Sequence, residues 1–340
     1  MALPMRRAML ERSMAPRSLL LFGLSLLFSG ACSTSPEEIE RLEDFQQRAT
    51  RYYEADDLDR AEQQARMGLA IDEDHAILNL ILGRTYLKRH DLRSVAQSKF
   101  YLEKAYDQKE EFRTSYSLGE YHLRYAEFLL GQADLLEDRA SRLPEGEAAA
   151  AAEMEARSKT QRAKAQEHLR QSQELLGEAL AESPKSLFAL RLMASCASHL
   201  GLEEEALGAI QALVSELQRS RKWKNSRLAS DGSLDIAQEQ HLRDLLKEEM
   251  GMEVDARGLA AALHKNAGQY EEAIEELTQL LNLAPSLERE YFNRGMCHYW
   301  LGHLDLATED MKQFLRRTPL KMDADEVSQA LDILAEAERD

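Results

Sequence analysis

"REYFNRGMCHYWLGHLDLATEDMKQFLRRTP", residues Arg289–Pro319, repeats the pattern of "DARGLAAALHKNAGQYEEAIEELTQLLNLAP", residues Asp255–Pro285, at a spacing of 34 residues. Four positions recur between the two copies: His264 and His298, Gly268 and Gly302, Ala273 and Ala307, Pro285 and Pro319. Alanine allows two helices to pack closely, glycine permits a tight turn between them, and proline ends the second helix. Each copy is therefore predicted to be a helix-turn-helix unit.

This pattern resembles the tetratricopeptide repeat, which reads W-x₂-L-G-x₂-Y, then A-x₃-F, then P. Upstream segments have the same register, with first helices at Phe45-x₂-Arg48-Ala49, Asn79-x₂-Leu82-Gly83 and Leu190-x₂-Met193-Ala194. A single helix pair cannot bury its own apolar face, so such units stack on one another. We therefore predict an all-α fold: an α-solenoid of helix-turn-helix repeats of the tetratricopeptide type, with elongated helical hairpins.

The elongated hairpins are expected where the spacing exceeds that of a standard repeat. Residues 111–186 read as two long helices separated at Leu143-Pro144-Glu145-Gly146, and the second helix rejoins the repeat register before Pro184. Residues Ala148–Arg170 have almost no large apolar side chains, which predicts a solvent-exposed projection. A second extension is expected between Leu213 and Val254.

The predicted organisation divides the chain into seven segments. These are a signal peptide (1–31), a polar tether (32–40), N-terminal repeats (41–110), an elongated hairpin (111–186), a repeat with extended helices (187–253), two repeats (254–319) and a capping helix (320–340).

The N-terminus has the composition of a secretory signal peptide. Four arginines precede the uncharged run "SLLLFGLSLLFSGA", residues 18–31, which is shorter than the roughly 20 residues that a membrane-spanning helix needs. Ser29-Gly30-Ala31-Cys32 resembles a bacterial lipobox, which implies cleavage before Cys32 and lipid attachment to its thiol. Ser33 after the cysteine implies sorting to the outer membrane, on the periplasmic side. Ordinary cleavage after Ala31 without lipidation is the alternative.

The negative charge of the chain argues against nucleic acid as a partner and against membrane attachment through charge. The chain has 43 basic and 60 acidic residues, and loss of residues 1–31, with four arginines and one glutamate, takes the formal net charge from −17 to −20. Nucleic acid requires a basic footprint, so we expect no nucleic-acid binding. Only 16 glycines and 7 prolines occur, which favours helix throughout. Membrane attachment is expected through the lipid instead of through charge.

We find no sequence pattern for catalysis, a metal or a cofactor. The chain has no paired-histidine zinc motif, phosphate-binding glycine loop or nucleophile elbow. Cys196 and Cys297 occupy equivalent repeat positions, and His264 and His298 fall where the repeat has a packing tyrosine. We therefore predict core packing for these residues, no enzyme activity, no metal and no cofactor.

The resemblance also implies a binding surface on the concave face of the solenoid, lined by set positions of each first helix. Three groups of residues occupy those positions: Ile77, Leu80, Arg84, Leu87 and Lys88; Phe188, Arg191, Ser195 and His199; and Arg289, Phe292, Met296, Tyr299 and Trp300. Aromatic side chains and arginines are common binding anchors, and Tyr299 with Trp300 is the strongest pair. The alternative for this pair is that the capping helix covers it.

A local basic patch interrupts the acidic sequence. It consists of Arg219, Arg221, Lys222, Trp223, Lys224 and Arg227. These residues would contact lipid headgroups or an acidic partner, or they form a solvated helix end with the tryptophan packed down.

Together these features predict a membrane-anchored protein–protein interaction scaffold in the periplasm. Its layout is similar to pilotin-type lipoproteins of type IV pilus biogenesis, which implies binding of a protein or peptide during assembly of an envelope machine such as a pilus or secretion system. Two alternatives remain: a docking regulator of cell-wall enzymes, and a scaffold that associates with itself as a homo-oligomer.

Overall fold

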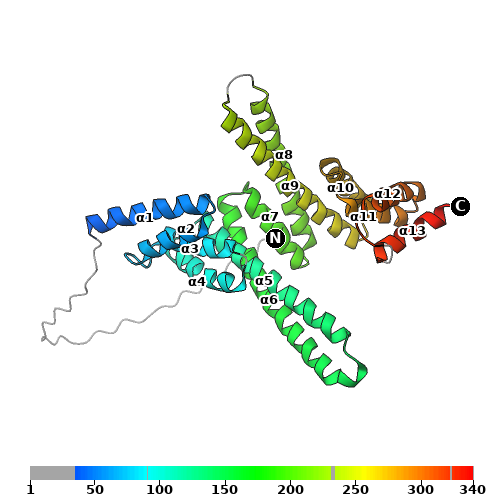
Figure 1. The fold of residues 1–340 in the computed structure, drawn as a ribbon, viewed down its shortest axis with the longest axis horizontal. Coiled ribbons are helices and arrows are strands. Elements are labelled where there is room, and N and C mark those ends of the chain that lie inside the picture. The colour runs from blue at the N-terminus through cyan, green and yellow to red at the C-terminus, as the bar shows by residue number, and fades with distance from the viewer. Residues whose placement is uncertain (1–34, 90, 231–233, 322–323, 340) are drawn as a thin grey trace, which may run out of the picture.

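The computed structural model describes residues 35–89, 91–230, 234–321 and 324–339. Cys32 and the predicted signal peptide lie outside the described residues. Thirteen α-helices occur in the described ranges, and they form antiparallel pairs that stack along the chain (Figure 1). The predicted all-α solenoid with elongated hairpins is confirmed.

The helices are arranged as six pairs and a final single helix. Their bounds are α1 (Pro36–Glu54), α2 (Leu58–Leu69), α3 (Ala76–Lys88), α4 (Leu92–Gln108), α5 (Phe112–Ser141), α6 (Ala148–Glu182), α7 (Leu187–His199), α8 (Glu203–Leu228), α9 (Ile236–Asn266), α10 (Tyr270–Leu283), α11 (Glu288–Trp300), α12 (Leu304–Arg317) and α13 (Asp325–Ala337).

Side-chain caps fix the positions at which two of the N-terminal helices begin. Ser35 caps α1, with its hydroxyl oxygen accepting a hydrogen bond from the Glu38 N–H. Helix therefore begins at Pro36, so residues 36–40, which were predicted to belong to the polar tether, are helical. Asp91 caps α4 in the same way through the Ser94 N–H. The second helix of that repeat therefore begins at Leu92.

Small residues determine how closely the paired helices approach. A Cβ atom at Gly83 of α3 would lie 2.6 Å from Leu102 Cγ of α4, and one at Gly119 of α5 would lie 3.0 Å from Leu176 Cγ of α6. The turns predicted at Gly268 and Gly302 both have φ of +75°, a conformation that favours glycine. Close helix contact and tight turns thus follow directly from the repeat pattern.

The two elongated hairpins are built differently. The α5–α6 hairpin lengthens the two helices of one repeat, whereas the α8–α9 hairpin joins the second helix of one repeat to the first helix of the next. Turns within repeats and turns between repeats lie at opposite ends of the helices. The two hairpins therefore project in opposite directions (Figure 1).

The α5–α6 projection is held together by small and polar residues. Ala133, Ala140, Ser158 and Ala165 are buried between its helices. Arg162 of α6 donates hydrogen bonds to Asp134 (2.7 Å) and Glu137 (2.8 Å) of α5. The segment predicted to be polar and exposed is thus a close-packed helix pair with a narrow alanine-rich seam.

The α8–α9 projection contains a buried cluster of ion pairs. Glu253 of α9 is 2% exposed, accepts hydrogen bonds from Arg257 Nε (3.1 Å) and Nη2 (3.0 Å), and forms an ion pair with Arg221 of α8. Arg257 Nη1 also pairs with Glu276 of α10 at 2.6 Å. The cluster therefore connects three successive helices.

Replacing Glu253 with Gln leaves two arginines next to a neutral side chain in a buried site. We expect a loss of about 3–5 kcal/mol in local stability, because breaking one partner of a buried ion pair leaves a charge uncompensated. Amide hydrogen exchange in α8 and α9 measures this loss. Glu239→Gln, which breaks the exposed pair with Arg243, is the matched control and should cost at most about 0.5 kcal/mol. Equal effects of the two substitutions would contradict the stabilising role of the cluster.

Candidate functional site

A concave site lies between α3, α5 and α7. It is a cavity of about 340 Å³ with a residue of α1 at its edge. The side chains that line it are Tyr53, Arg84, Leu87, Lys88, Phe112, Arg113, Tyr116, Glu120, Arg124, Ser186, Phe188 and Arg191. The structure therefore brings together five residues predicted for the concave face, from two groups that are about 100 residues apart in sequence.

The floor of this cavity comes from α5, which was predicted only as part of the elongated hairpin of residues 111–186. Ser115-x₂-Leu118-Gly119-x₂-His122 has the repeat register, shifted by 36 residues from Asn79-x₂-Leu82-Gly83-x₂-Tyr86. The same shift takes Arg84 to Glu120 and Lys88 to Arg124, and both α5 residues line the cavity. The Leu118-Gly119 pair is the signal that would have identified these residues.

A second cavity of about 340 Å³ continues the groove towards α9. It shares Glu120, Arg124 and Arg191 with the first cavity and adds Ser195, which was predicted for this face. Ser195 Oγ lies 3.4 Å from Glu127 Oε1 as a donor, and His199 Nε2 lies 3.6 Å from the same oxygen. Glu127 and Asp255 make this end of the groove acidic.

Two residues of the first predicted group are not available to a partner as surface anchors. Leu80 is 5% exposed and packs in an apolar cluster with Leu118 and Tyr121 of α5. Leu87 is 2% exposed and belongs to the same cluster, although it forms part of the cavity wall. Ile77 is half-buried against the N-terminal core. The presence of α5 as a packed neighbour explains the burial of Leu80 and Leu87.

The C-terminal group of predicted residues does not join this groove. Arg289 lines a separate cavity between α9 and α11 and lies 3.5 Å from Glu326 of α13. Phe292 is buried against Phe314, with ring centroids 5.2 Å apart, and Met296 packs in the same cluster, so the prediction that Phe292 is a surface anchor is wrong.

Of the predicted pair, Tyr299 is contacted by the capping helix and Trp300 is exposed. The hydroxyl of Tyr299 donates to Glu336 of the capping helix α13 at 2.8 Å. Trp300 remains 45% exposed and packs against Tyr270, with ring centroids 4.9 Å apart. The capping helix thus contacts Tyr299 and leaves Trp300 accessible.

The predicted basic patch is not a continuous surface. Lys224 is buried, and its Nζ pairs with Glu249 at 2.6 Å, while Arg221 pairs with Glu253 and Arg219 with Glu216. Trp223 is 62% exposed, and Lys222 and Arg227 are exposed near it. The helical period directs Arg221 and Lys224 into the hairpin, where they neutralise glutamates of α9.

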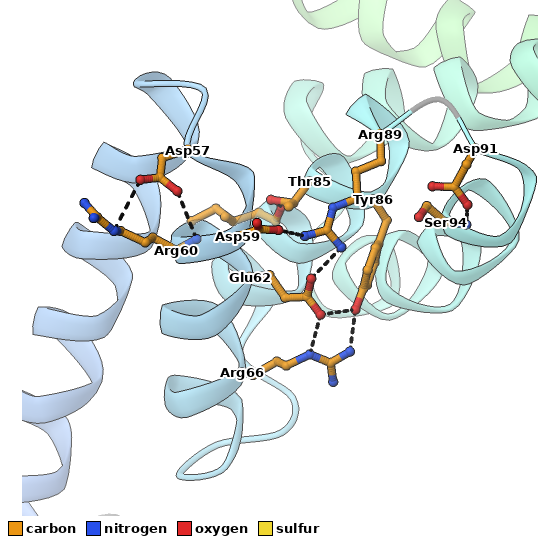
Figure 2. Close-up of polar contacts among 11 residues, drawn as sticks. Asp57, Asp59, Arg60, Glu62, Arg66, Thr85, Tyr86, Arg89, Asp91 and Ser94 are labelled. Carbon is orange, nitrogen blue, oxygen red and sulfur yellow. Dashed lines mark hydrogen bonds and ion pairs between the residues drawn. The ribbon is translucent and has the colours of Figure 1, made fainter.

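A polar network between α2 and α3 has a structural role (Figure 2). Glu62 accepts hydrogen bonds from Tyr86 Oη (2.7 Å) and Arg66 Nε (2.8 Å) and pairs with Arg89 (2.6 Å). Burial and the neighbouring Glu62 raise the pKa of Tyr86 to about 12. All four groups are satisfied by one another, so the network stabilises the helix contact and presents no unpaired group to a ligand.

The two cysteines of the described ranges are core residues, as predicted. Cys196 and Cys297 have no exposed surface, and burial raises the pKa of each thiol to about 11. Both are therefore protonated thiols at neutral pH, which are poor nucleophiles and metal ligands. His264 and His298 are only half-buried. Within the described residues, no group of three or more histidine, cysteine and acidic side chains has the geometry to hold a metal ion.

A histidine pair, with His122 buried and His168 half-buried, joins the two helices of the long repeat. His122 Nδ1 of α5 lies 2.8 Å from His168 Nδ1 of α6, so one ring donates its proton to the other. Burial and the neighbouring His168 and Lys99 lower the pKa of His122 to about 3. Burial and Lys99 also lower the pKa of His168, against a smaller opposing effect of Glu167. Both rings are therefore neutral at pH 7.

Comparison with known proteins places the repeat family at the C-terminal part of the chain. A tetratricopeptide repeat model matches residues 260–332, from the end of α9 into α13. No curated protein matches the sequence. Among the described residues, no helix combines the length and apolarity needed to cross a membrane.

Several solved structures are similar to this chain over most of its length at low sequence identity. YrrB, a TPR protein with an unusual peptide-binding site, is 10% identical, with 81% of this chain and 97% of that chain covered and a TM-score of 0.46. Pseudomonas aeruginosa PilF is 14% identical, with 78% and 89% covered and a TM-score of 0.42. A thermophilic TPR protein from Thermus thermophilus is also 14% identical, with 82% and 99% covered and a TM-score of 0.40.

The histidine pair predicts a pH-dependent stability of the long hairpin. The unfolded chain binds a proton at His122 below about pH 6.5 and the folded protein does so only near pH 3, so stability falls as the pH drops through this window. His122→Phe should retain about 2 kcal/mol more of its unfolding free energy than wild type on acidification from pH 7 to pH 5. Urea denaturation at both pH values measures this difference. His241→Phe, at an exposed site of α9, is the control, and identical curves for wild type and His122→Phe would disprove the assignment.

Proposed function

We propose that this protein is a non-enzymatic scaffold that is anchored to the bacterial outer membrane at Cys32 and binds a protein or peptide segment from the periplasm. The observation that supports binding is the groove formed by α3, α5, α7 and α9, which successive first helices of the repeats line continuously. Assembly of an envelope machine, such as a pilus or secretion system, is the role that this combination favours.

The short connection to the anchor has a geometric consequence. Three residues separate Cys32 from the first residue of α1, Pro36. A chain of this length spans at most about 14 Å, at roughly 3.5 Å per residue. A lipid on Cys32 would therefore keep the first turn of α1 close to the membrane surface. The groove meets α1 at Tyr53, near the other end of this helix, and so lies further from the anchor.

Lipid attachment is tested by replacing the modified residue. Cys32→Ser should move the protein from the membrane fraction to the soluble fraction, because the diacylglyceryl thioether cannot form without the thiol. Fractionation of cells and intact mass of the purified protein measure this outcome. Cys196→Ser, at a buried thiol, is the control and should remain in the membrane fraction. A Cys32→Ser protein that stays in the membrane contradicts the anchor.

Partner binding in the groove is tested by photo-crosslinking in living cells. A benzophenone amino acid at Phe188, which is 46% exposed and lines the groove, should capture a specific protein. The matched control is Phe100 of α4, which is 61% exposed and does not line the groove. The same crosslinked species at both positions, or none at Phe188, would argue against the groove as the binding surface.

A further inference from the structure

The cavity between α3, α5 and α7 has a charge opposite to that of the chain. The whole sequence has a formal net charge of −17. Five cationic side chains and a single acidic one, Glu120, line this cavity. The cations come from three separate helices, so the cluster is created by the stacking of repeats and is not a basic run in the sequence.

Two of the five cations are neutralised within the protein. Lys88 Nζ pairs with Asp56 at 2.9 Å. Arg124 pairs with Glu120 at 2.6 Å and also donates to the Leu87 carbonyl oxygen at 3.0 Å. These contacts use the one acid that faces the cavity.

The remaining three cations have no acidic partner in the described part of the chain. They are Arg84, Arg113 and Arg191. Arg84 lies over the ring of Tyr53, with its Cζ 5.0 Å from the centroid, and this contact leaves its N–H groups unpaired with any carboxylate. Like charges held at one cavity repel each other, and this repulsion is relieved when an anion binds.

Aromatic side chains lie among these arginines. Phe112 and Tyr116 stack with their ring centroids 5.8 Å apart, and Phe188 faces the same cavity with 46% of its surface exposed. Burial raises the pKa of Tyr116. The nearby charges of Arg84, Arg191 and Arg124 lower this pKa, but by less. The hydroxyl of Tyr116 makes no hydrogen bond to any other described residue, so it is a donor available to a ligand.

We propose that this cavity binds an acidic peptide segment, with carboxylates paired to Arg84, Arg113 and Arg191 and one apolar side chain against Tyr116 and Phe188. Guanidinium groups bind carboxylates through two parallel hydrogen bonds, which suits three arginines around one site. The volume of about 340 Å³ accepts a few side chains of a peptide or loop. This inference rests on the proposed function and specifies its ligand.

The groove also orients the ligand. Beyond Arg191 it becomes acidic at Glu127 and Asp255, which would repel further carboxylates. The acidic residues of the ligand are therefore confined to the end of the groove at α3 and α5, and the segment that continues towards α9 is neutral or basic.

Three fluorescein-labelled hexapeptides with the mature full-length protein test this inference by fluorescence anisotropy. The probes are Glu-Glu-Trp-Glu-Glu-Leu and the same peptide with Gln or Lys in place of Glu. The acidic probe should bind at least 10-fold more tightly than the Gln probe, and its affinity should fall with salt. Versions with a free or an amidated C-terminus show whether side-chain carboxylates or a terminal carboxylate supplies the contact.

Charge reversal identifies the residues responsible. Arg84→Glu with Arg191→Glu should weaken the acidic probe at least 30-fold and strengthen the Lys probe. Arg157→Glu with Arg316→Glu, at exposed sites of α6 and α12, changes the net charge equally and should leave the acidic probe unchanged. Arg84→Gln with Arg191→Gln provides a milder pair, with circular dichroism as the check on folding, and should weaken binding at least 10-fold.

Equal affinity for the acidic and Gln probes, or equal effects of the two charge-reversed pairs, would overturn the acidic-ligand inference. If the acidic-ligand inference fails but Phe188 still gives a specific crosslink, the groove binds a ligand of another chemistry. The proposed function then remains in place. If neither the preference for the acidic probe nor the specific crosslink at Phe188 were observed, the proposed function would be overturned as well.

Discussion

The close contact between the two helices of each repeat is the constraint on which the whole solenoid depends. In three repeats a glycine of the first helix faces a large side chain of the second: Gly83 and Leu102, Gly119 and Leu176, Gly295 and Met311. Because each pair is narrow at this point, its outer apolar surface is left to pack on the next pair. Repetition of this step curves the stack and aligns the first helices, and their alignment forms the groove.

The same constraint explains how the chain accommodates its two long hairpins. The base of α5–α6 retains the repeat contact at Gly119, so lengthening both helices together adds a projection without disturbing the stack. The two helices of the α8–α9 extension are held together differently, because they belong to two successive repeats. The ion pairs of Arg221 with Glu253 and of Lys224 with Glu249 provide directional contacts between α8 and α9, where the repeat pattern supplies no seam of small residues.

The repeat pattern predicted the fold, whereas the site required the three-dimensional stack. Gly268, Gly302 and the alanines at fixed spacing are local signals, so the sequence alone indicated the helix pairs. The exposure of a first-helix position depends on the neighbouring helix. Leu80 and Leu87 were predicted to face a partner, but they pack on α5, because that helix is a repeat helix as well as half of a hairpin. Phe292 is buried by a different neighbour, because it packs on Phe314 of α12, the second helix of its own repeat.

Electrostatics links the stack to the proposed ligand. An acidic protein resists the approach of an acidic peptide at long range, but salt screens charges beyond a separation of about 8 Å at physiological ionic strength. At the cavity the nearest charges are those of Arg84, Arg113 and Arg191, which no internal acid of the described chain neutralises. Binding is therefore favoured only for a segment that reaches the cavity, and acidic proteins that touch the outer surface are repelled. The distribution of charge thus gives the groove selectivity for a protruding acidic loop or end over a broad acidic surface.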